Sequence, residues 1–523
     1  MDFATVVRTS ARQYATNAAV WHDGEIQTYA QLYERGCRLA NALGNLGLDK
    51  RDRVALLGAN GPNTVEQIAG VALGGFIRAA LYAHQTGEVN AYLLDHVGAR
   101  ALIIHEAHLQ ELVPHLAGVP SLEYVIVYGA VAHEGDYLDY ERLLAGASAA
   151  DPQIPQSPQD GHVIRFSAGT TGRPKGIYHT VEAWLGLCNE YRWVTPQIDE
   201  RDSYLAAGPL THAAVIFLWP MLMVGARIVV MEAFDPQRAL QLIDEQRITF
   251  TLVVPTMIQA MVAHRDAATR DLSTLRCLNY AASPISETTL TKAVDVFGPV
   301  LYQLYAQSEA VPATMLLPHQ HCPRGSERER RWMRSVGRAT PNAKLTIVDD
   351  DGNPLPVGEV GEVAVKTPGQ MTGLWDDPEG TARRLTRDGS VRTRDMGRLD
   401  DDGFLYLADR KEDMIISGGY NIWPAELENA IAAHPAVAEV CVVGVPHEKW
   451  GETPIAVVVP TPGEDAPDPD QLIELTRERV GSVMKVTRVE FVDELPKSGV
   501  GKVLRRVVRD RYWEGRSERV GGA

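Results

Sequence analysis

The chain has 523 residues, of which 45% are hydrophobic, and it carries a formal net charge of −16. This length exceeds what a single hydrophobic core usually serves, so at least two domains are expected. Because an acidic surface repels nucleic acid and anionic membranes, those partners are excluded, and any polyanion must bind at a local basic site.

Signals for compartment and membrane insertion are weak or absent in the sequence. The five cysteines form no CxxC pair, which is typical of buried, reduced thiols in a cytoplasmic protein. The N-terminal segment is polar with an early acid, so it does not resemble a signal peptide. The longest apolar run, residues 213–225, is too short to span a bilayer and predicts a core segment. We expect a cytoplasmic protein without a transmembrane segment, either a monomer or a homodimer.

In chain order, the proline-rich residues 151–160 are expected to form a loop. Residues 226–231 then have the pattern of a buried strand, and residues 235–248 that of a helix. Residues 249–255 have the pattern of a second strand. A strand, a helix and a strand in this order predict a parallel pair joined by a crossover helix, and hence an α/β layer architecture.

The last part of the chain has a different pattern, in which helices and strands alternate over short distances. Residues 424–434 and 470–480 are predicted to be helices, and residues 437–445 and 453–460 strands. We therefore expect a large N-terminal domain of layered sheets and helices, residues 1–409. A small α+β C-terminal domain, residues 410–523, would follow it.

The segment "RFSAGTTGRPKG", residues 165–176, combines glycines, threonines and one lysine. Backbone N–H groups in a glycine-rich turn can converge on an anion, because glycine tolerates the backbone angles that this requires. Thr170 and Thr171 add hydroxyl donors and Lys175 adds a positive charge, so a nucleotide triphosphate is the natural guest. A solvated surface turn is the alternative. A Walker loop is excluded, since it needs adjacent glycine and lysine followed by serine or threonine.

Three further stretches carry candidate functional groups. In "YAQSEA", Tyr305 offers a ring face for a purine, Ser308 a donor for a phosphate, and Glu309 an oxygen ligand for Mg²⁺. The two oxygens of Asp395 suit a ribose diol, and Lys502 ends the glycine-bearing loop "LPKSGVGK". Taken singly, each has an ordinary structural interpretation as a core tyrosine, a turn residue or a solvated lysine.

Together, and in this order, the motifs resemble those of the adenylate-forming superfamily in its acyl-CoA ligase branch. That group includes fatty-acyl- and aryl-CoA ligases, adenylation domains and beetle luciferase. The similarity includes "SAGTTGRPKG", "GPLTHAAV", "YAASP", "YAQSE", "VRTRDMG", "ADRKEDMIISGGYNIWPAELE", "VPHEKWGE" and "LPKSGVGK". It implies an AMP-forming acid–thiol ligase, which joins a carboxylic acid to ATP and passes the acyl group of the acyl-AMP to coenzyme A.

The resemblance assigns roles to the motif residues. The implied ATP and coenzyme A contacts are Ser167, Thr170, Thr171, Gly172, Lys175, Ala282, Ser283, Tyr305, Ser308, Asp395, Arg410, Gly418, Gly419 and Trp450. The implied catalytic residues are Lys502, Glu309, His212 and Thr170. Glu309 and Thr170 would place Mg²⁺, and Lys502 would stabilise the charge that develops as the carboxylate attacks the α-phosphate.

The resemblance also implies that the C-terminal domain is mobile. After adenylation this domain would rotate about Glu412, so that Lys502 leaves the site. The loop of Gly418 and Gly419 would then approach the thiol arm of coenzyme A. Trp450 would contact the coenzyme A nucleotide, with a packed core tryptophan as the alternative.

For the acyl group, the resemblance implies a pocket gated by His212. Its expected lining is Leu210, His212, Ala213, Val215, Trp219, Tyr280, Ala281, Ser283, Ala306 and Gln307. These residues are mostly apolar and include no arginine or lysine that could pair with a second carboxylate. The expected substrate is therefore an apolar monocarboxylic acid, whether fatty, aryl or polycyclic.

Several positions depart from the family pattern. Ala168 replaces a usual serine, and Ala281, Ala306 and Arg394 replace usual glycines. The alanines add a Cβ near the expected pocket, and Arg394 puts a charge beside Asp395. Residues 78–90 match poorly and are expected to differ in shape.

Three other functions are alternatives to the coenzyme A ligase. The acyl group could go to a carrier protein, or a partner could complete the thioester step, and both remain open. A luciferase-like reaction is compatible with the fold, but nothing in the sequence favours it. A catalytically silent binding protein is disfavoured by the presence of Lys502, Glu309 and Lys175.

Overall fold

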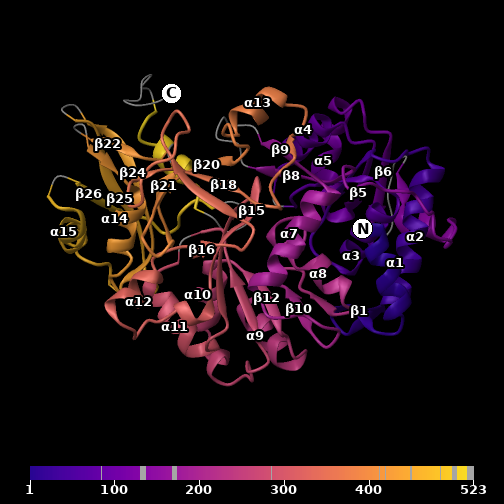
Figure 1. Cartoon of the computed structure of the whole chain (residues 1–523), viewed down its shortest axis with the longest axis horizontal. Helices are drawn as coiled ribbons and strands as arrows, with labels where there is room; N and C mark the ends of the chain where they lie inside the picture. Colours follow the sequence, from indigo (N-terminus) through magenta and orange to yellow (C-terminus); the bar gives the residue numbers. More distant parts are fainter. Residues whose placement is uncertain are drawn as a thin grey trace.

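The computed structural model describes residues 1–83, 85–129, 137–167, 174–283, 285–410, 413–417, 420–447, 450–463, 465–482, 484–497 and 503–514. In Figure 1 the N-terminal part of the chain occupies the right and centre of the molecule, and the C-terminal strands lie at the left. Among the described residues the strands form four sheets, two large and two small. The predicted α/β fold is confirmed.

The first large sheet has a parallel centre and antiparallel edges. Its order is β16 (Arg338–Ala339), β15 (Ala310–Leu316), β14 (Leu301–Gln307), β13 (Cys277–Tyr280), β12 (Phe250–Val253), β10 (Ser203–Ala206), β11 (Arg227–Val230), β1 (Ala18–His22) and β2 (Glu25–Thr28). Strands β10, β12 and β13 are buried at every position, as expected for parallel strands that helices cover on both faces.

The second large sheet contains the two strands that flank the glycine-rich loop. Its order is β19 (Gly373–Leu374), β9 (Lys175–Thr180), β8 (Gly161–Ser167), β4 (Ile77–Ala80), β3 (Arg53–Leu57), β5 (Ala101–His105), β6 (Tyr124–Tyr128) and β7 (Leu138–Asp139). Strands β8 and β9 are antiparallel neighbours, with Ser167 opposite Lys175. The loop between them, residues 168–173, lies outside the described residues.

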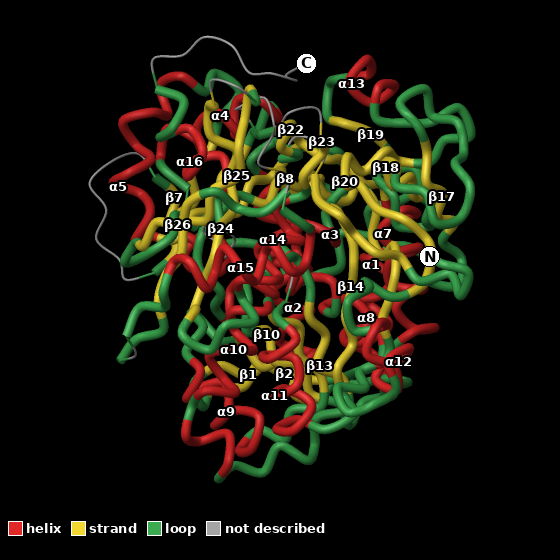
Figure 2. The backbone as a smooth tube through the Cα atoms, turned by 90° about the vertical axis from the view of Figure 1, so that its left-hand side faces the viewer, coloured by secondary structure: helices red, strands yellow, loops and turns green. Residues whose placement is uncertain are grey.

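The two smaller sheets follow in the chain. One has the order β17 (Lys344–Val348), β18 (Gly361–Lys366), β20 (Val391–Leu399) and β21 (Leu405–Arg410). The other has the order β23 (Tyr420–Ile422), β22 (Ile415–Ser417), β25 (Gly451–Pro460) and β24 (Val437–His447), with β26 (Arg488–Phe491) paired to β25. Helices α14 and α15 pack on this last sheet (Figure 2), which confirms the α+β unit predicted there.

Helices connect and cover the sheets. They are α1 (Phe3–Gln13), α2 (Tyr29–Asn45), α3 (Pro62–Leu73), α4 (Gly87–Val97), α5 (Leu109–Leu112), α6 (Tyr140–Ala145), α7 (Val181–Val194), α8 (Leu218–Met223), α9 (Pro236–Glu245), α10 (Pro255–Ala263), α11 (Glu287–Phe297), α12 (Glu327–Trp332), α13 (Pro378–Arg383), α14 (Pro424–Ile431), α15 (Pro469–Val480) and α16 (Arg505–Asp510). Short 3₁₀ turns occupy Glu106–His108, Val113–Gly118, Ala213–Ile216, Arg265–Ala268 and Pro318–Gln320. No helix in the described part of the chain is long and apolar enough to cross a membrane.

The strand, helix and strand predicted at residues 226–255 are β11, α9 and β12. Asp235 is the N-cap of helix α9, and its carboxylate accepts a hydrogen bond from the Arg238 N–H at 2.7 Å. The two strands belong to one sheet, as predicted, but β10 lies between them and pairs in parallel with both. The predicted direct pairing of β11 with β12 is therefore wrong, because order along the chain does not reveal which earlier strand is inserted.

Candidate active site

The candidate site lies where the two large sheets meet the sheet of β17, β18, β20 and β21. One hydrophobic cluster joins these elements, with Ile177 from β9, Ala310 and Ala313 from β15, Val363 from β18 and Leu405 from β21. A bridge between Ala310 and Gln370 adds a backbone connection. Motif residues that are far apart in the sequence are thereby held on neighbouring strand ends.

Asp395 on β20 is held by two side chains from β14. Its Oδ2 accepts hydrogen bonds from the Tyr305 hydroxyl at 2.6 Å and from Gln307 Nε2 at 2.7 Å. Gln307 Nε2 also donates to the Thr393 carbonyl at 2.7 Å, which fixes the amide orientation. Asp395 faces Arg410 across the β20–β21 ladder. Gln307 was expected in the acyl pocket, but its amide donates to Asp395, the carboxylate predicted to bind the ribose hydroxyls. This hydrogen bond fixes the orientation of the Asp395 side chain.

Arg394 precedes Asp395 and has a left-handed backbone, with φ of 62°. The family pattern has glycine here, and glycine adopts this conformation freely. The Glu362 carboxylate holds the Arg394 backbone in this conformation. Its Oε1 accepts a hydrogen bond from the Arg394 N–H at 3.0 Å, and its Oε2 pairs with Arg392 at 2.6 Å. The substitution is therefore accommodated by a local carboxylate.

Glu309 follows β14, and its side chain is 7% exposed. Its Oε1 accepts a hydrogen bond from Arg384 Nη2 at 2.6 Å, which makes a largely buried ion pair. No group of three or more metal-ligating side chains occurs among the described residues. A lone carboxylate still fits Mg²⁺, which usually takes one or two carboxylates and completes its shell with substrate phosphates and water.

Lys175, the first residue of β9, pairs with Asp377 at the N-terminus of helix α13. Its Nζ lies 3.2 Å from Asp377 Oδ2, and Asp377 Oδ1 caps the helix by accepting the Gly380 N–H at 2.7 Å. That backbone hydrogen bond and the nearby lysine lower the pKa of Asp377. The C-terminal cap of the same helix is Arg384, the partner of Glu309. Two residues expected to bind phosphate and Mg²⁺ are therefore paired with the two ends of α13.

We expect the Asp377→Asn variant to bind Mg-ATP about 1.4–5-fold more tightly. Asparagine caps a helix about as well as aspartate, so the variant removes the competing charge and keeps α13. The pair is partly exposed, so its loss is worth about 0.2–1 kcal/mol. Isothermal titration calorimetry measures the change.

The matched control is Asp377→Ala, which removes the cap as well. It should also release Lys175 but lower the free energy of unfolding by about 1 kcal/mol. Weaker ATP binding by Asp377→Asn would contradict competition and would mean that Asp377 positions Lys175 for the phosphates.

Ser308 sits in the turn after β14, where its backbone is held from β8. Its carbonyl accepts a hydrogen bond from Arg165 Nη2 at 2.9 Å. The β14–β15 register shifts between Tyr305 and Gln307, so Ala306 lies at a bulge. Bulges re-aim neighbouring side chains, which is consistent with the turn of Tyr305 and Gln307 toward Asp395.

His212, the expected gate, precedes the 3₁₀ turn Ala213–Ile216 and contacts Tyr82. The Tyr82 hydroxyl lies 3.4 Å from His212 Nδ1 and donates to the Phe166 carbonyl at 2.6 Å. Burial, reinforced by the positive charge of Arg165, lowers the pKa of His212 to about 4. The imidazole is therefore neutral at physiological pH, and a gating role would rest on rotation rather than on titration.

We expect His212 to make the protein less stable in mild acid. Its native pKa of about 4 lies below the ordinary 6.5, so the unfolded chain binds a proton that the native chain does not. The stabilisation is full above pH 6.5 and is lost as pH falls toward 4, at most about 3 kcal/mol in all. Urea unfolding at several pH values measures the slope. His212→Asn should flatten it by about one proton between pH 6.5 and 4, and an unchanged slope would contradict the assignment.

The expected acyl-pocket residues divide between two hydrophobic clusters. Leu210, Val215, Trp219 and Ala281 belong to one cluster, with Ala213 and Ala306 packed against it. Tyr280 belongs to the other, and its hydroxyl lies 2.9 Å from Nε2 of His321. Ser283 is partly exposed, after Ala282 with φ of 81°. Six of the ten expected residues thus share the first cluster, while Tyr280 is directed to the opposite face of the sheet.

Several predicted residues lie outside the described residues: Thr170, Thr171, Gly172, Glu412, Gly418, Gly419 and Lys502. Ser167 and Arg410 are described only as strand residues. Trp450 is 42% exposed and stacks on His447 at 4.4 Å between ring centroids, so the alternative of a packed core tryptophan is wrong. Its contact with coenzyme A stays a prediction.

Sequence reasoning missed four residues that organise the site: Tyr82, Arg165, Asp377 and Arg384. Arg165 opens the quoted glycine-rich segment, yet only the loop that follows it was given a role. Asp377 precedes a proline, which is typical of a helix N-terminus. Nothing local marks Arg384 as the partner of Glu309, because the contact spans 75 positions.

Comparisons with known proteins agree with the resemblance. A family model described as AMP-binding enzyme matches residues 7–375, and one described as AMP-binding enzyme C-terminal domain matches residues 426–502. The medium/long-chain-fatty-acid–CoA ligase FadD8 of Mycobacterium tuberculosis is 36% identical over 510 residues, covering 94% of this chain and 87% of the relative. A feruloyl-CoA synthase of Amycolatopsis is 35% identical over 507 residues, covering 96% and 97%.

Two further similarities extend the range of named activities. The fatty acid–[acyl-carrier-protein] ligase ScoC of Streptomyces coeruleorubidus is 32% identical over 523 residues, covering 97% of this chain and 96% of the relative. The solved structure of the amide bond synthetase McbA from Marinactinospora thermotolerans has a TM-score of 0.87 at 28% identity, covering 98% and 100%.

The fold and these matches define an adenylate-forming enzyme, as the motifs predicted. The chain belongs to the AMP-binding enzyme family, and both family models, together with relatives over nearly its whole length, support this assignment.

Proposed function

We propose that this protein is an ATP-dependent acyl-CoA ligase that activates a carboxylic acid with a largely apolar body. The observation that carries the proposal is the hydrogen-bonded group of Asp395, Tyr305 and Gln307, together with Lys175 and Glu309, which are ion-paired with the two ends of α13. Relatives named as fatty-acid–CoA ligase and feruloyl-CoA synthase support fatty and aryl acids as candidates.

The proposed chemistry has two steps. A carboxylate oxygen of the acid attacks the α-phosphorus of ATP, the bond to the β-phosphate breaks, and pyrophosphate leaves. The coenzyme A thiol then loses its proton to solvent, its sulfur attacks the acyl carbon, the bond from that carbon to the phosphate oxygen breaks, and AMP leaves. Bound Mg²⁺ would neutralise phosphate charge during the first step. Asp395 would hold the ribose diol, Lys175 the terminal phosphates, and Glu309 the metal. The C-terminal domain, which is proposed to be mobile, would bring Lys502 to the site for the first step.

The remaining assignments are part of the same proposal. The domain boundary lies near Arg410 and the pivot at Glu412. The protein acts as a monomer or homodimer in the cytoplasm, where a reducing environment suits five unpaired cysteines, four of them buried. The relative named as a carrier-protein ligase supports a carrier protein as the alternative acceptor.

One incubation tests the proposal. Purified protein and Mg-ATP are incubated with a panel of fatty, aryl and polycyclic acids, with and without coenzyme A, and the products are read by mass spectrometry. Acyl-CoA that appears only with coenzyme A is the expected result. Acyl-AMP that accumulates even when coenzyme A is present would favour the carrier-protein alternative. The absence of both acyl-AMP and acyl-CoA with every acid would overturn the proposal.

A further inference from the structure

Two arginines are buried side by side on the inner face of the second large sheet. Arg78 on β4 is 1% exposed and Arg165 on β8 is 3% exposed. Arg78 pairs with Val163 in the β4–β8 ladder, and Arg165 is two residues further along β8, so both side chains leave the same face. Neither arginine belongs to the residues expected to bind the nucleotide or the acid, and Arg78 opens the stretch that matches the family pattern poorly.

These guanidinium groups have few hydrogen-bond partners for their burial. Arg165 donates from Nη2 to the Ser308 carbonyl and lies over the Trp184 ring at 5.1 Å, but its Nε has no partner. Arg78 makes one long contact of 3.5 Å, from Nη1 to the Leu210 carbonyl, while its Nε and Nη2 have none. Among the described residues, no carboxylate accepts a hydrogen bond from either arginine.

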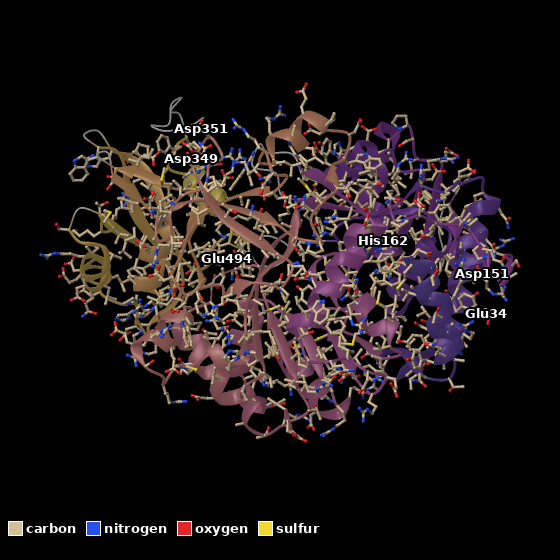
Figure 3. The ribbon with its side chains drawn as sticks, in the orientation of Figure 1. Glu34, Asp151, His162, Asp349, Asp351 and Glu494 are labelled. Carbon is tan, nitrogen blue, oxygen red and sulfur yellow. The ribbon has the colours of Figure 1, made fainter. Side chains whose placement is uncertain are left out.

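Burial lowers the pKa of Arg165, and the Glu309 carboxylate, itself ion-paired with Arg384, offsets part of this shift, whereas no carboxylate among the described residues affects the pKa of Arg78. His162 and His179 are both buried in the same layer, and burial holds the pKa of each well below its ordinary value, so they are neutral. Figure 3 labels His162 near helix α7, where it stacks on Phe3 with ring centroids 4.1 Å apart. Burial and the charge of Arg165 lower the pKa of Arg78 to about 9, which still leaves it protonated at neutral pH.

Buried charges of this kind are costly unless something in the working state offsets them. The surroundings of the two arginines indicate which group offsets this cost. Arg78 contacts the carbonyl of Leu210, two residues before His212, and Arg165 contacts that of Ser308 and affects the pKa of His212. Both guanidinium groups therefore border the segments between which the proposed function places the acyl group.

We propose that Arg78, with Arg165 beside it, binds a second oxygen acceptor on the body of the acid substrate. The preferred acid is then one whose otherwise apolar body bears a carbonyl, a hydroxyl or a second carboxylate, rather than the plain hydrocarbon of the same shape. This inference rests on the proposed function. It also revises the expectation, drawn from motif positions alone, that the pocket has no arginine.

The test compares acids that differ only in one oxygen-bearing group. The pairs are decanoate with decanedioate, cinnamate with para-coumarate, and cyclohexylacetate with its para-oxo derivative, and the readout is ATP–pyrophosphate exchange. The wild type should favour the oxygenated member of at least one pair by about 10-fold or more in kcat/KM, since buried donors reject an analogue that cannot satisfy them. Arg78→Met should abolish that preference and leave kcat/KM for the plain member of each pair within about threefold of the wild-type value.

Folding is controlled separately. Replacing a poorly paired buried charge by an apolar side chain of similar volume is often neutral or stabilising, so Arg78→Met should unfold at an equal or higher temperature. The matched control is Arg227→Met, a change at a partly buried arginine on β11 that donates hydrogen bonds to the Ser203 hydroxyl and the Gln246 carbonyl. It should lower the unfolding temperature and leave the substrate preference unchanged.

Each outcome bears on one proposal or both. Exchange with plain acids at rates equal to their oxygenated partners, unaffected by Arg78→Met, would overturn the inference and leave the ligase standing. A preference for the plain member in every pair would likewise overturn the inference without affecting the proposed ligase activity. No exchange with any acid would remove the proposed function, and the inference would fall with it.

Discussion

Glu309→Gln is expected to lower the rate of acyl-AMP formation by about 10²–10³-fold. Glutamine keeps the shape and one acceptor oxygen but removes the charge that would hold Mg²⁺, a contribution of several kcal/mol to the transition state. It also leaves Arg384 without its counter-ion in a largely buried position, so the free energy of unfolding should fall by about 3 kcal/mol. ATP–pyrophosphate exchange and urea unfolding measure the two effects.

Arg384→Gln separates these causes. It breaks the same ion pair, so it should destabilise the protein by a similar amount, yet it leaves the Glu309 carboxylate available to the metal. We expect adenylation to fall by less than about 10-fold in this variant. Equal losses of adenylation in the two variants would show that Glu309 acts through the ion pair and would remove its metal role. The dependence of the rate on Mg²⁺ concentration adds a second readout, which should change in Glu309→Gln.

The second large effect is expected from Lys502→Ala. Lys502 is proposed to stabilise charge on the carboxylate and the α-phosphate only while they react, and the loss of one such donor typically costs on the order of 10²–10³ in rate. The second step does not need Lys502 to stabilise charge at the α-phosphate, so the rate of thioester formation should remain within about threefold of the wild-type rate. The two steps are measured apart, the first by ATP–pyrophosphate exchange and the second by acyl-CoA formation from synthetic acyl-AMP.

Lys497→Ala provides the matched control on the same segment. Lys497 forms an exposed ion pair with Glu439, and such pairs contribute little to stability, so both steps should proceed at the wild-type rate. If Lys502→Ala slowed both half-reactions equally, the proposed exchange of domain positions would be untenable.

Much of the fold was predictable because its signals are local. The buried strand patterns and the proline-started helix α9 need only neighbouring residues, and both are where the sequence predicts them. The position of β10 between β11 and β12 was not predictable, since a strand buried on both faces fits any central place in a sheet.

The site was predictable in its motif residues and not in their partners. Asp395 and Tyr305 were expected near the nucleotide, and they are hydrogen-bonded to each other across two sheets. Arg384 and Asp377 were missed because their partners are 75 and 202 positions away, and sequence spacing carries no information on such contacts. Tyr280 illustrates the opposite error, as adjacent residues on a strand point to opposite faces.

Arg394 has one more consequence, for the unfolded chain. A glycine at this position would give up more conformational freedom on folding, by about 0.5–1 kcal/mol, than any other residue. An arginine gives up less, but its left-handed backbone costs about 1–2 kcal/mol. The backbone cost exceeds the entropic gain, so the exchange of glycine for arginine lowers stability by about 0.5–1 kcal/mol. The exchange also adds stiffness, since Asp395 is presented by a backbone with fewer alternative conformations to visit.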